Sequence, residues 1–160
     1  TSRSTEKLSR RAAFLGVKRN GWLMPEDRRT MFDGYLAQRY TGTDLEQAER
    51  CQVGEACAAW LFRQGLMVYA PIPSWHHIAR AHHINGDYVT FAALNRAGIE
   101  ACREFWILDY DEPGKSAGVQ DERQIAKDAG KIDRLIGIYL GVAASGPHIF
   151  YWLGEAPFQT

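Results

Sequence analysis

The pattern of apolar and polar positions along the chain predicts strands that alternate with helices. Residues 66–72 and 104–110 are short, nearly continuous apolar runs of the kind found in buried parallel strands, and 31–40 and 147–153 are also expected to be strands. Helical periodicity indicates helices at 45–64, at 88–102 and from Val119 onward, with Gly130 as a candidate position for a bend.

Local signals mark several boundaries of these elements. Thr43, Asp44, Leu45 and Glu46 form a capping-box pattern at the start of the helix over 45–64, and Gly65 is a typical residue for its end. Loops are expected over 73–87, which contains Pro73, Trp75 and four histidines, and over 111–118. A further short helix is expected over 4–18, within an N-terminal helical extension formed by residues 1–30.

This order of elements predicts an α/β fold for the whole chain. Strands that alternate with helices form parallel sheets with right-handed crossovers. We therefore expect one domain, residues 1–160, with a flavodoxin-like or Rossmann-like three-layer sandwich: a mainly parallel sheet of four to five strands with helices on both faces. Ligands bind such sheets at the carboxyl ends of the strands, which here are followed by loops 38–43, 71–87 and 110–118.

Composition narrows the classes of partner. Lys+Arg and Asp+Glu both number 19, so the net charge is zero and electrostatic capture of nucleic acid or of an anionic membrane is not expected. No apolar run approaches the roughly 20 residues of a membrane helix, and the N-terminal segment lacks the apolar core of a signal peptide. Cys51, Cys57 and Cys102 are odd in number and lack CxxC spacing, so we expect reduced thiols and a cytoplasmic protein.

Glu122 is the residue that departs from the helical pattern. It falls on the apolar stripe of its helix, with Val119 and Ala126, whereas Arg123 and Lys127 fall on the opposite face. A carboxylate that points inward at the carboxyl edge of a sheet is a candidate nucleophile or acid/base. The alternative is that Glu122 only meets the preference for acidic residues near a helix start.

Several segments together resemble the nucleoside 2-deoxyribosyltransferase-like superfamily, and in particular a subfamily found in bacteria and their phages. The most specific is Ser116-x-Gly118-Val119-x-x-Glu122, followed by Ala126. The hydrophobic framing consists of Tyr35-Leu36-Ala37-x-Arg39-Tyr40, then Ala58, Ala59, Leu61 and Gly65, then Val68-Tyr69-Ala70-Pro71-Ile72 and Phe105-Trp106-Ile107-Leu108. The resemblance covers residues 33 to about 131.

The resemblance implies a covalent glycosyl-transfer mechanism. Glu122 would attack the anomeric carbon of a nucleoside, expel the base and form a glycosyl ester, which water or another base resolves. Tyr35 would orient this nucleophile. Ser116 matches the phosphate-binding Ser of the relatives that cleave nucleoside 5′-monophosphates, and the N–H groups of Gly118 and Val119 would add donors at the helix start.

Other residues of the expected site carry alternatives that the sequence leaves open. Arg39 and Thr41 would supply a cation and a hydroxyl to a phosphate, but Arg39 also suits a surface ion pair. Ser116 also suits a helix cap, and Tyr35 also suits a core position. Trp75 would stack on a base or fill the core.

Asn95 is a departure from the family pattern. It stands where the family carries an Asp that assists base departure or binds the sugar, and an amide cannot transfer a proton. Asp87 is the candidate replacement, with a helix cap as its alternative interpretation.

The histidines at 76, 77, 82 and 83 lack a Cys, Asp or Glu among them, so we expect no metal and no other cofactor, with His77 in the pocket instead. The sequence thus predicts an N-glycosidase that acts on a nucleoside 5′-monophosphate through Glu122. Base exchange by a nucleoside 2-deoxyribosyltransferase and nucleotide binding without turnover are the alternatives. The resemblance also implies a homodimer, and the expected partner is a small nucleotide or nucleoside.

Overall fold

A computed structural model describes residues 30–143 and 146–155, with side chains described up to residue 138. The helical extension expected for residues 1–30 therefore lies almost wholly outside the described residues. None of the described helices combines the length and the apolar character needed to cross a membrane.

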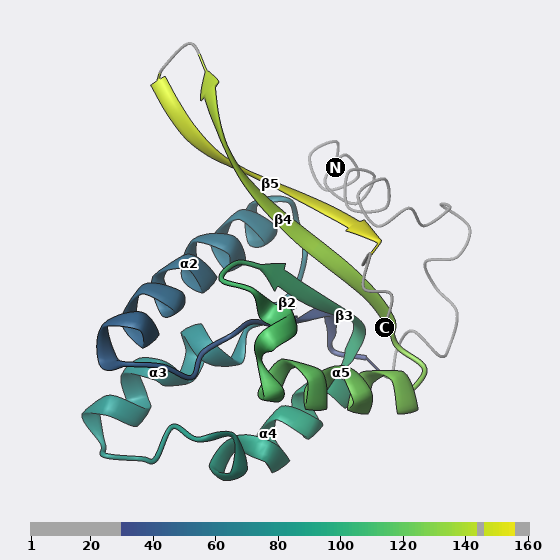
Figure 1. The fold of residues 1–160 in the computed structure, drawn as a ribbon. Coiled ribbons are helices and arrows are strands. Elements are labelled where there is room, and N and C mark those ends of the chain that lie inside the picture. The colour runs from purple at the N-terminus through teal and green to yellow at the C-terminus, as the bar shows by residue number, and fades with distance from the viewer. Residues whose placement is uncertain (1–29, 144–145, 156–160) are drawn as a thin grey trace, which may run out of the picture.

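Five strands form one sheet in the order β2-β1-β3-β4-β5 (Figure 1). They are β1 (Phe32–Ala37), β2 (Val68–Tyr69), β3 (Cys102–Asp109), β4 (Ile132–Ala143) and β5 (Gly146–Glu155). The pairs β1–β2, β1–β3 and β3–β4 are parallel, and β5 runs antiparallel to β4. The mainly parallel sheet predicted from the sequence is confirmed.

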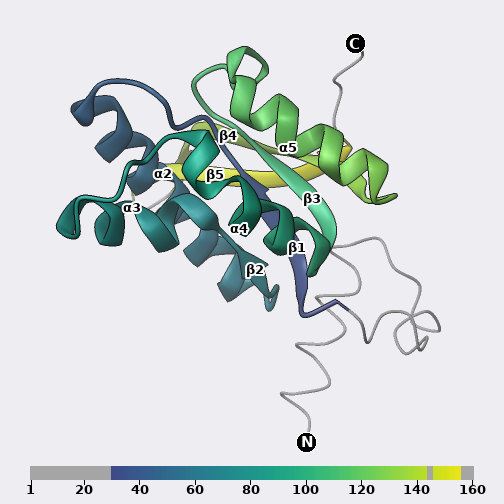
Figure 2. The same ribbon diagram turned by 90° about the horizontal axis from the view of Figure 1, so that it is seen from below.

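Helices pack against both faces of the sheet. The helices are α2 (Asp44–Arg63), α3 (Pro71–Ala81), α4 (Tyr88–Glu100) and α5 (Ala117–Asp128), with a 3-10 turn at Pro113–Lys115. Because side chains alternate along a strand, Leu36 and Trp106 pack with Leu61 of α2 in one core, whereas Tyr35 and Phe105 pack with residues of α4 and α5 in the other. The structure is therefore a three-layer α/β sandwich, and Figure 2 shows α4 in front of β1, seen from below.

The segment 73–87, expected to be a loop, is helical over most of its length. α3 begins at Pro71 and continues to Ala81, so the strand expected over 66–72 shrinks to Val68–Tyr69 at the edge of the sheet. Pro71 occupies the first helical position, and Pro73 also lies within the first turn, where backbone N–H groups have no partner inside the helix. Neither proline therefore interrupts α3.

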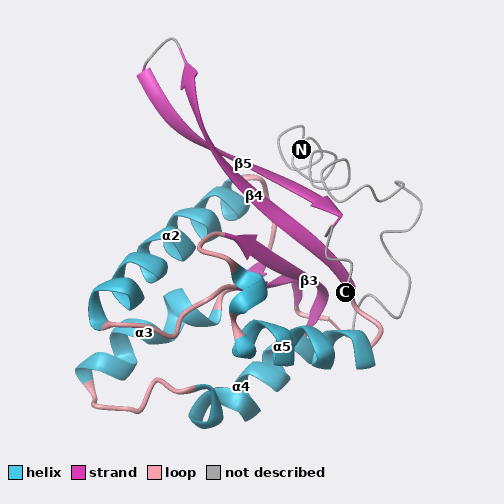
Figure 3. Cartoon of the chain, in the orientation of Figure 1, coloured by secondary structure: helices cyan, strands magenta, loops and turns pink. Residues whose placement is uncertain are grey.

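The C-terminal part of the chain also differs from the prediction. The helix that starts near residue 119 does not bend at Gly130 but ends at Asp128, and Gly130 has a φ of +70°, a left-handed conformation that suits a helix end. The next segment is strand β4, which the sequence analysis missed. The strand expected at 147–153 is β5, the second arm of an antiparallel hairpin rather than a further parallel strand (Figure 3).

Candidate functional site

A pocket lies at the carboxyl ends of β1, β2 and β3. In the strand order, the chain continues from β1 to β2 on one side and to β3 on the other, so the topological switch point lies between β1 and β3. Ligands bind at this point in folds of this type. The pocket encloses about 620 Å³, including space at its open mouth. It is lined from all three loops named by the sequence analysis, by Gln38, Tyr40, Thr41, Pro71, Ile72, Trp75, His76, Ala79, Gly86, Asp87, Tyr88, Phe91, Asn95, Ser116, Gly118, Val119 and Glu122.

Glu122 reaches this pocket from α5. The helix turns its apolar face to the sheet, and Glu122 shares that face with the buried residues Val119 and Ala126. Only 8% of the Glu122 surface is exposed to solvent. The inward position predicted from the helical pattern is confirmed.

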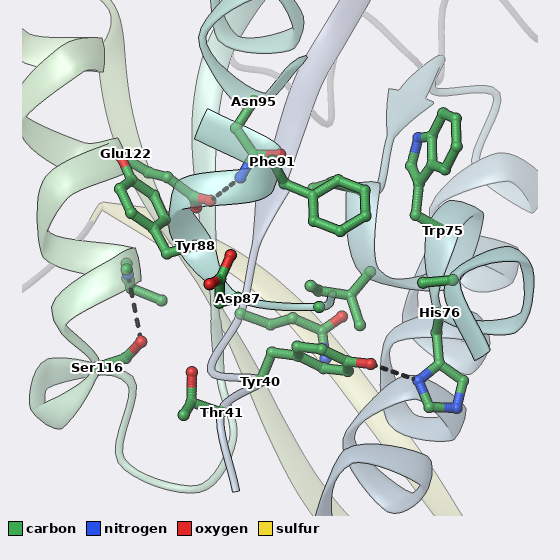
Figure 4. Close-up of a pocket in the computed structure, with 17 residues that line it drawn as sticks. Tyr40, Thr41, Trp75, His76, Asp87, Tyr88, Phe91, Asn95, Ser116 and Glu122 are labelled. Carbon is green, nitrogen blue, oxygen red and sulfur yellow. Dashed lines mark hydrogen bonds between the residues drawn. The ribbon is translucent and has the colours of Figure 1, made fainter. Parts of the chain in front are cut away.

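Two polar groups from neighbouring elements lie at the Glu122 carboxyl group. Asn95 of α4 donates from Nδ2 to Glu122 Oε1 at 3.0 Å (Figure 4). Tyr35 of β1 is fully buried, and its hydroxyl lies close enough to influence the carboxyl group without meeting the geometry of a hydrogen bond. Asn95 therefore holds Glu122 directly.

Burial changes the acidity of this group. It raises the pKa of Glu122 to about 8, an effect that the neighbouring Tyr35 hydroxyl opposes and the Asp121 charge increases. The pKa of Tyr35 is raised for the same reason, first by burial and then by the charge of Glu122. At neutral pH this shift favours the protonated form of the Glu122 carboxyl group.

The start of α5 forms another wall of the pocket. Ser116 is the N-cap, and its Oγ accepts from the Val119 N–H at 3.3 Å. The cap interpretation of Ser116 is thus confirmed, and the residue also lines the pocket beside Gly118. Figure 4 shows Ser116 and Thr41 on the same side of the pocket. A capping Ser accepts through a lone pair, so its O–H proton stays available to a ligand.

Aromatic side chains form the other side. Trp75 of α3 and Phe91 of α4 lie with ring centroids 5.9 Å apart, and both line the pocket. Tyr40 and His76 are joined by a hydrogen bond of 2.7 Å between the tyrosine hydroxyl and the histidine Nδ1. Flat apolar walls with a few polar groups are suited to a planar heterocyclic ligand.

Asp87 lines the pocket but acts as the N-cap of α4. Its Oδ1 accepts from the Thr90 N–H at 2.8 Å and from the Thr90 hydroxyl at 2.6 Å. These hydrogen bonds lower the pKa of Asp87. The helix-cap interpretation is confirmed, and a carboxylate held in its ionised form is poorly suited to donate a proton to a departing base.

Two expected site residues lie elsewhere. Arg39 is not part of the pocket lining, because its guanidinium turns to Asp111, donating to the backbone oxygen at 3.1 Å and pairing with Oδ1 at 3.7 Å. His77 points away from the pocket on the outer side of α3 and contacts Glu55 and Cys51. The expectation of His77 in the pocket was wrong by one residue, because in a helix the neighbouring His76 takes the inward position.

Sequence reasoning missed nine of the lining residues, among them Gln38, Tyr40, His76 and Phe91. Tyr40 and Gln38 immediately follow β1, so their place in a loop at the carboxyl edge was an available signal. Phe91 and His76 required knowledge of the helical phases of α3 and α4.

The metal ligands possible among the described residues lie outside this pocket. Cys51, Glu55 and His77 bring a sulfur, an oxygen and a nitrogen within 4.8 Å of one another. The three cysteines are free and buried.

Comparison with known proteins adds no family to these observations: no family model matches the chain, and a search of curated proteins found no match.

Proposed function

We propose that the protein is an N-glycosidase that cleaves the base–sugar bond of a nucleoside 5′-monophosphate, with Glu122 as the nucleophile. The observation that carries the proposal is the Glu122 carboxyl group, buried in the pocket and held by Asn95 at 3.0 Å. A carboxylate with restricted solvation and a fixed orientation suits attack on an anomeric carbon, and its negative charge would stabilise an oxocarbenium-like transition state.

The rest of the pocket supports a nucleotide as the substrate. Trp75 and Phe91 offer apolar and aromatic surface to a base. On the other side, the Ser116 and Thr41 hydroxyls and the amino end of α5 offer donors to a phosphate. The sugar would then lie between the two, near Glu122.

The proposed reaction has two balanced steps. The ionised Glu122 oxygen forms a bond to the anomeric carbon as the bond to the base nitrogen breaks, and the base takes a proton from water. A water molecule then attacks the same carbon, transfers a proton to solvent and frees the carboxylate, leaving the sugar 5-phosphate. If a second base replaces water in the second step, the reaction is the base exchange of a deoxyribosyltransferase.

The second candidate is a nucleotide-binding protein without turnover, and the ionised Asp87 favours it. Asp87 and Glu122 are the carboxyl groups that line the pocket, and the hydrogen bonds of Asp87 lower its pKa. With Asn95 in place of an acid, no protonated Asp is at hand for a departing base. Nucleobases with a good leaving-group nitrogen would still depart with a proton from water.

Release of free base separates these candidates. The full chain would be incubated with a panel of ribo- and deoxyribonucleoside 5′-monophosphates, with and without an acceptor base, and free base and new nucleotide would be separated by chromatography. We expect base release from at least one nucleotide, and a decrease by at least about 10²-fold in both Glu122→Gln and Glu122→Ala. Gln124→Glu, on the exposed face of α5, serves as a control substitution.

Two results would contradict the glycosidase proposal. Nucleotide binding without base release from any member of the panel would favour the binding protein. Base release that persists in both Glu122 variants would remove Glu122 from the chemistry.

A further inference from the structure

The side chains of Cys51, Glu55 and His77 converge at the contact between α2 and α3, away from the Glu122 pocket. The Cys51 Sγ lies 3.6 Å from Glu55 Oε1 and 3.9 Å from His77 Nε2, and the last two atoms are 2.8 Å apart. Cys51 and Glu55 are one helical turn apart on α2, so they share a face, and α3 packs against α2 to bring His77 to them. The three donor atoms thus come together from two elements.

We propose that Cys51, Glu55 and His77 bind a zinc ion. Thiolate, imidazole and carboxylate are the ligand types of zinc sites, with bond lengths of about 2.3 Å to sulfur and about 2.0–2.2 Å to nitrogen and oxygen. In a tetrahedron these lengths place sulfur about 3.6 Å from each of the other two donors, and nitrogen about 3.4 Å from oxygen. The Cys51–Glu55 distance of 3.6 Å matches this arrangement, and the Cys51–His77 distance of 3.9 Å is about 0.3 Å longer.

The remaining distance requires a small movement. The imidazole nitrogen and the carboxylate oxygen share a hydrogen bond of 2.8 Å and must separate by about half an ångström. Their side chains are 71% and 45% exposed, so both have room to rotate. The same exposure leaves the fourth coordination position to water.

The cluster also has the charge that a divalent cation requires. Zinc binds cysteine as the thiolate, so binding would release the Cys51 thiol proton to solvent. The Cys51 thiolate and the Glu55 carboxylate would then be two anionic ligands of one ion, and His77 would be the neutral third ligand.

The ion would fasten α3 to α2. His77 is directly preceded in α3 by His76, which lines the pocket and shares a hydrogen bond with Tyr40. The ion would therefore hold in place the helix that carries one wall of the pocket. The sequence offered no such site, because the histidine segment lacks a Cys or an acid of its own. The partners of His77 come from α2, which is 22 and 26 positions away along the chain.

Zinc titration of the full chain tests this inference without any enzyme assay. We expect one equivalent of Zn²⁺ to bind, and Co²⁺ in its place to show the charge-transfer absorption of a cobalt–thiolate bond. His77→Ala, Glu55→Gln and Cys51→Ser should each weaken binding by at least about 10-fold. His83→Ala and Cys57→Ala are matched controls, since both residues lie outside the cluster, and should change the affinity by less than about 2-fold.

His77→Ala decides the matter if the buried Cys51 variant fails to fold, because His77 is exposed and its loss leaves the core intact. A raised Tm with zinc in the unsubstituted chain, lost in His77→Ala, would support the site. The absence of stoichiometric binding, an unchanged affinity in His77→Ala, or cobalt bound without a thiolate band would overturn it.

Discussion

At the scale of single residues, the account depends on how Glu122 gains its charge. Burial raises the pKa of this carboxyl group to about 8, yet attack on a sugar requires the ionised form. Asn95 offsets part of this cost, since its Nδ2 donates to the carboxyl oxygen and a donated hydrogen bond favours the charged form. The pair is therefore a pH-sensitive unit within the pocket.

The first prediction concerns pH. In the proposed mechanism only ionised Glu122 attacks, so we expect kcat/KM for base release to rise with pH through a midpoint at about 8, where the carboxyl group of the free protein loses its proton. Values of kcat/KM measured at low nucleotide concentration between about pH 5 and about pH 9 would show the profile. A rate that falls as pH rises through this range would mean that Glu122 works as an acid instead.

A second prediction uses Asn95. Asn95→Asp replaces the donor at 3.0 Å by a second carboxyl group, and two carboxylates at this distance cannot both ionise easily. We expect the midpoint of the pH profile to move up by at least about 1 unit and the rate at neutral pH to fall by about 10-fold or more. Gln52→Glu, at an exposed position of α2 outside the pocket lining, also exchanges an amide for a carboxyl group; it is the control and should leave the midpoint unchanged.

An unchanged midpoint in Asn95→Asp would separate Asn95 from Glu122. An increased rate would show that an acid at this position supplies the proton to the departing base.

At the scale of elements, close packing of α4 against the sheet places Asn95 beside Glu122. Gly98 makes this approach possible: a Cβ at that position would lie 2.4 Å from Tyr69 Cε1 and 3.2 Å from Tyr35 Cε2. With a larger residue at position 98, α4 could not pack this closely against the two tyrosines. The position of α4, and with it Asn95, thus depends on one glycine.

The third prediction follows from this contact. Gly98→Ala should lower the free energy of unfolding by about 1–3 kcal/mol through overpacking, despite the better helix propensity of alanine. Gly118→Ala, also in a helix, is the matched control, because its Cβ would meet Tyr88 at an ordinary 3.5 Å. Urea unfolding of both variants gives the comparison. Equal free energies of unfolding for the two variants would show that α4 moves to accommodate the new methyl group without loss of stability.

The elements also show where sequence patterns succeed. The capping box at Thr43 and Glu46 is present, and the helical phase of α5 correctly placed Glu122 inside. α3 was missed because Pro71, Pro73 and the histidines resemble a loop, although prolines in a first turn break no helical hydrogen bond. β4 was missed because its Leu- and Ile-rich run suits a helix as well as a strand, and short apolar runs do not distinguish them.

At the scale of the whole molecule, local patterns predicted three of the four parallel strands, β1, β2 and β3, and the edge at which the pocket forms. The antiparallel β5 was not foreseen, because strand direction depends on the hairpin with β4 rather than on β5 itself. Side-chain partners across elements, such as Asn95 with Glu122 or His77 with Cys51, likewise depend on helix packing that no single segment encodes.

A fourth prediction links the pocket to global stability. Unfolded Glu122 loses its proton near its ordinary value of 4.5, whereas the folded group keeps it up to about 8. Between these values the folded state binds one proton more than the unfolded state, so stability falls as pH rises, by at most about 1.4 kcal/mol for each pH unit. Glu122→Gln cannot titrate and should lack this loss.

Urea unfolding of the unsubstituted chain and Glu122→Gln at several pH values measures the effect. The variant should gain relative stability steadily from about pH 5 to about pH 8, and Glu100→Gln, exposed at the end of α4, controls for the exchange of Glu for Gln. A stability difference that does not change with pH would mean that Glu122 titrates in the folded protein as it does in the unfolded chain.

The stereochemistry of the released sugar tests the central claim most directly. With methanol present during base release, the sugar would be captured as a methyl glycoside whose anomeric configuration is read by NMR. Attack by Glu122 followed by attack of the acceptor inverts the centre twice, so a β-nucleotide should give the β-glycoside. An α-glycoside would show direct displacement without a glycosyl-Glu122 ester and would contradict the account.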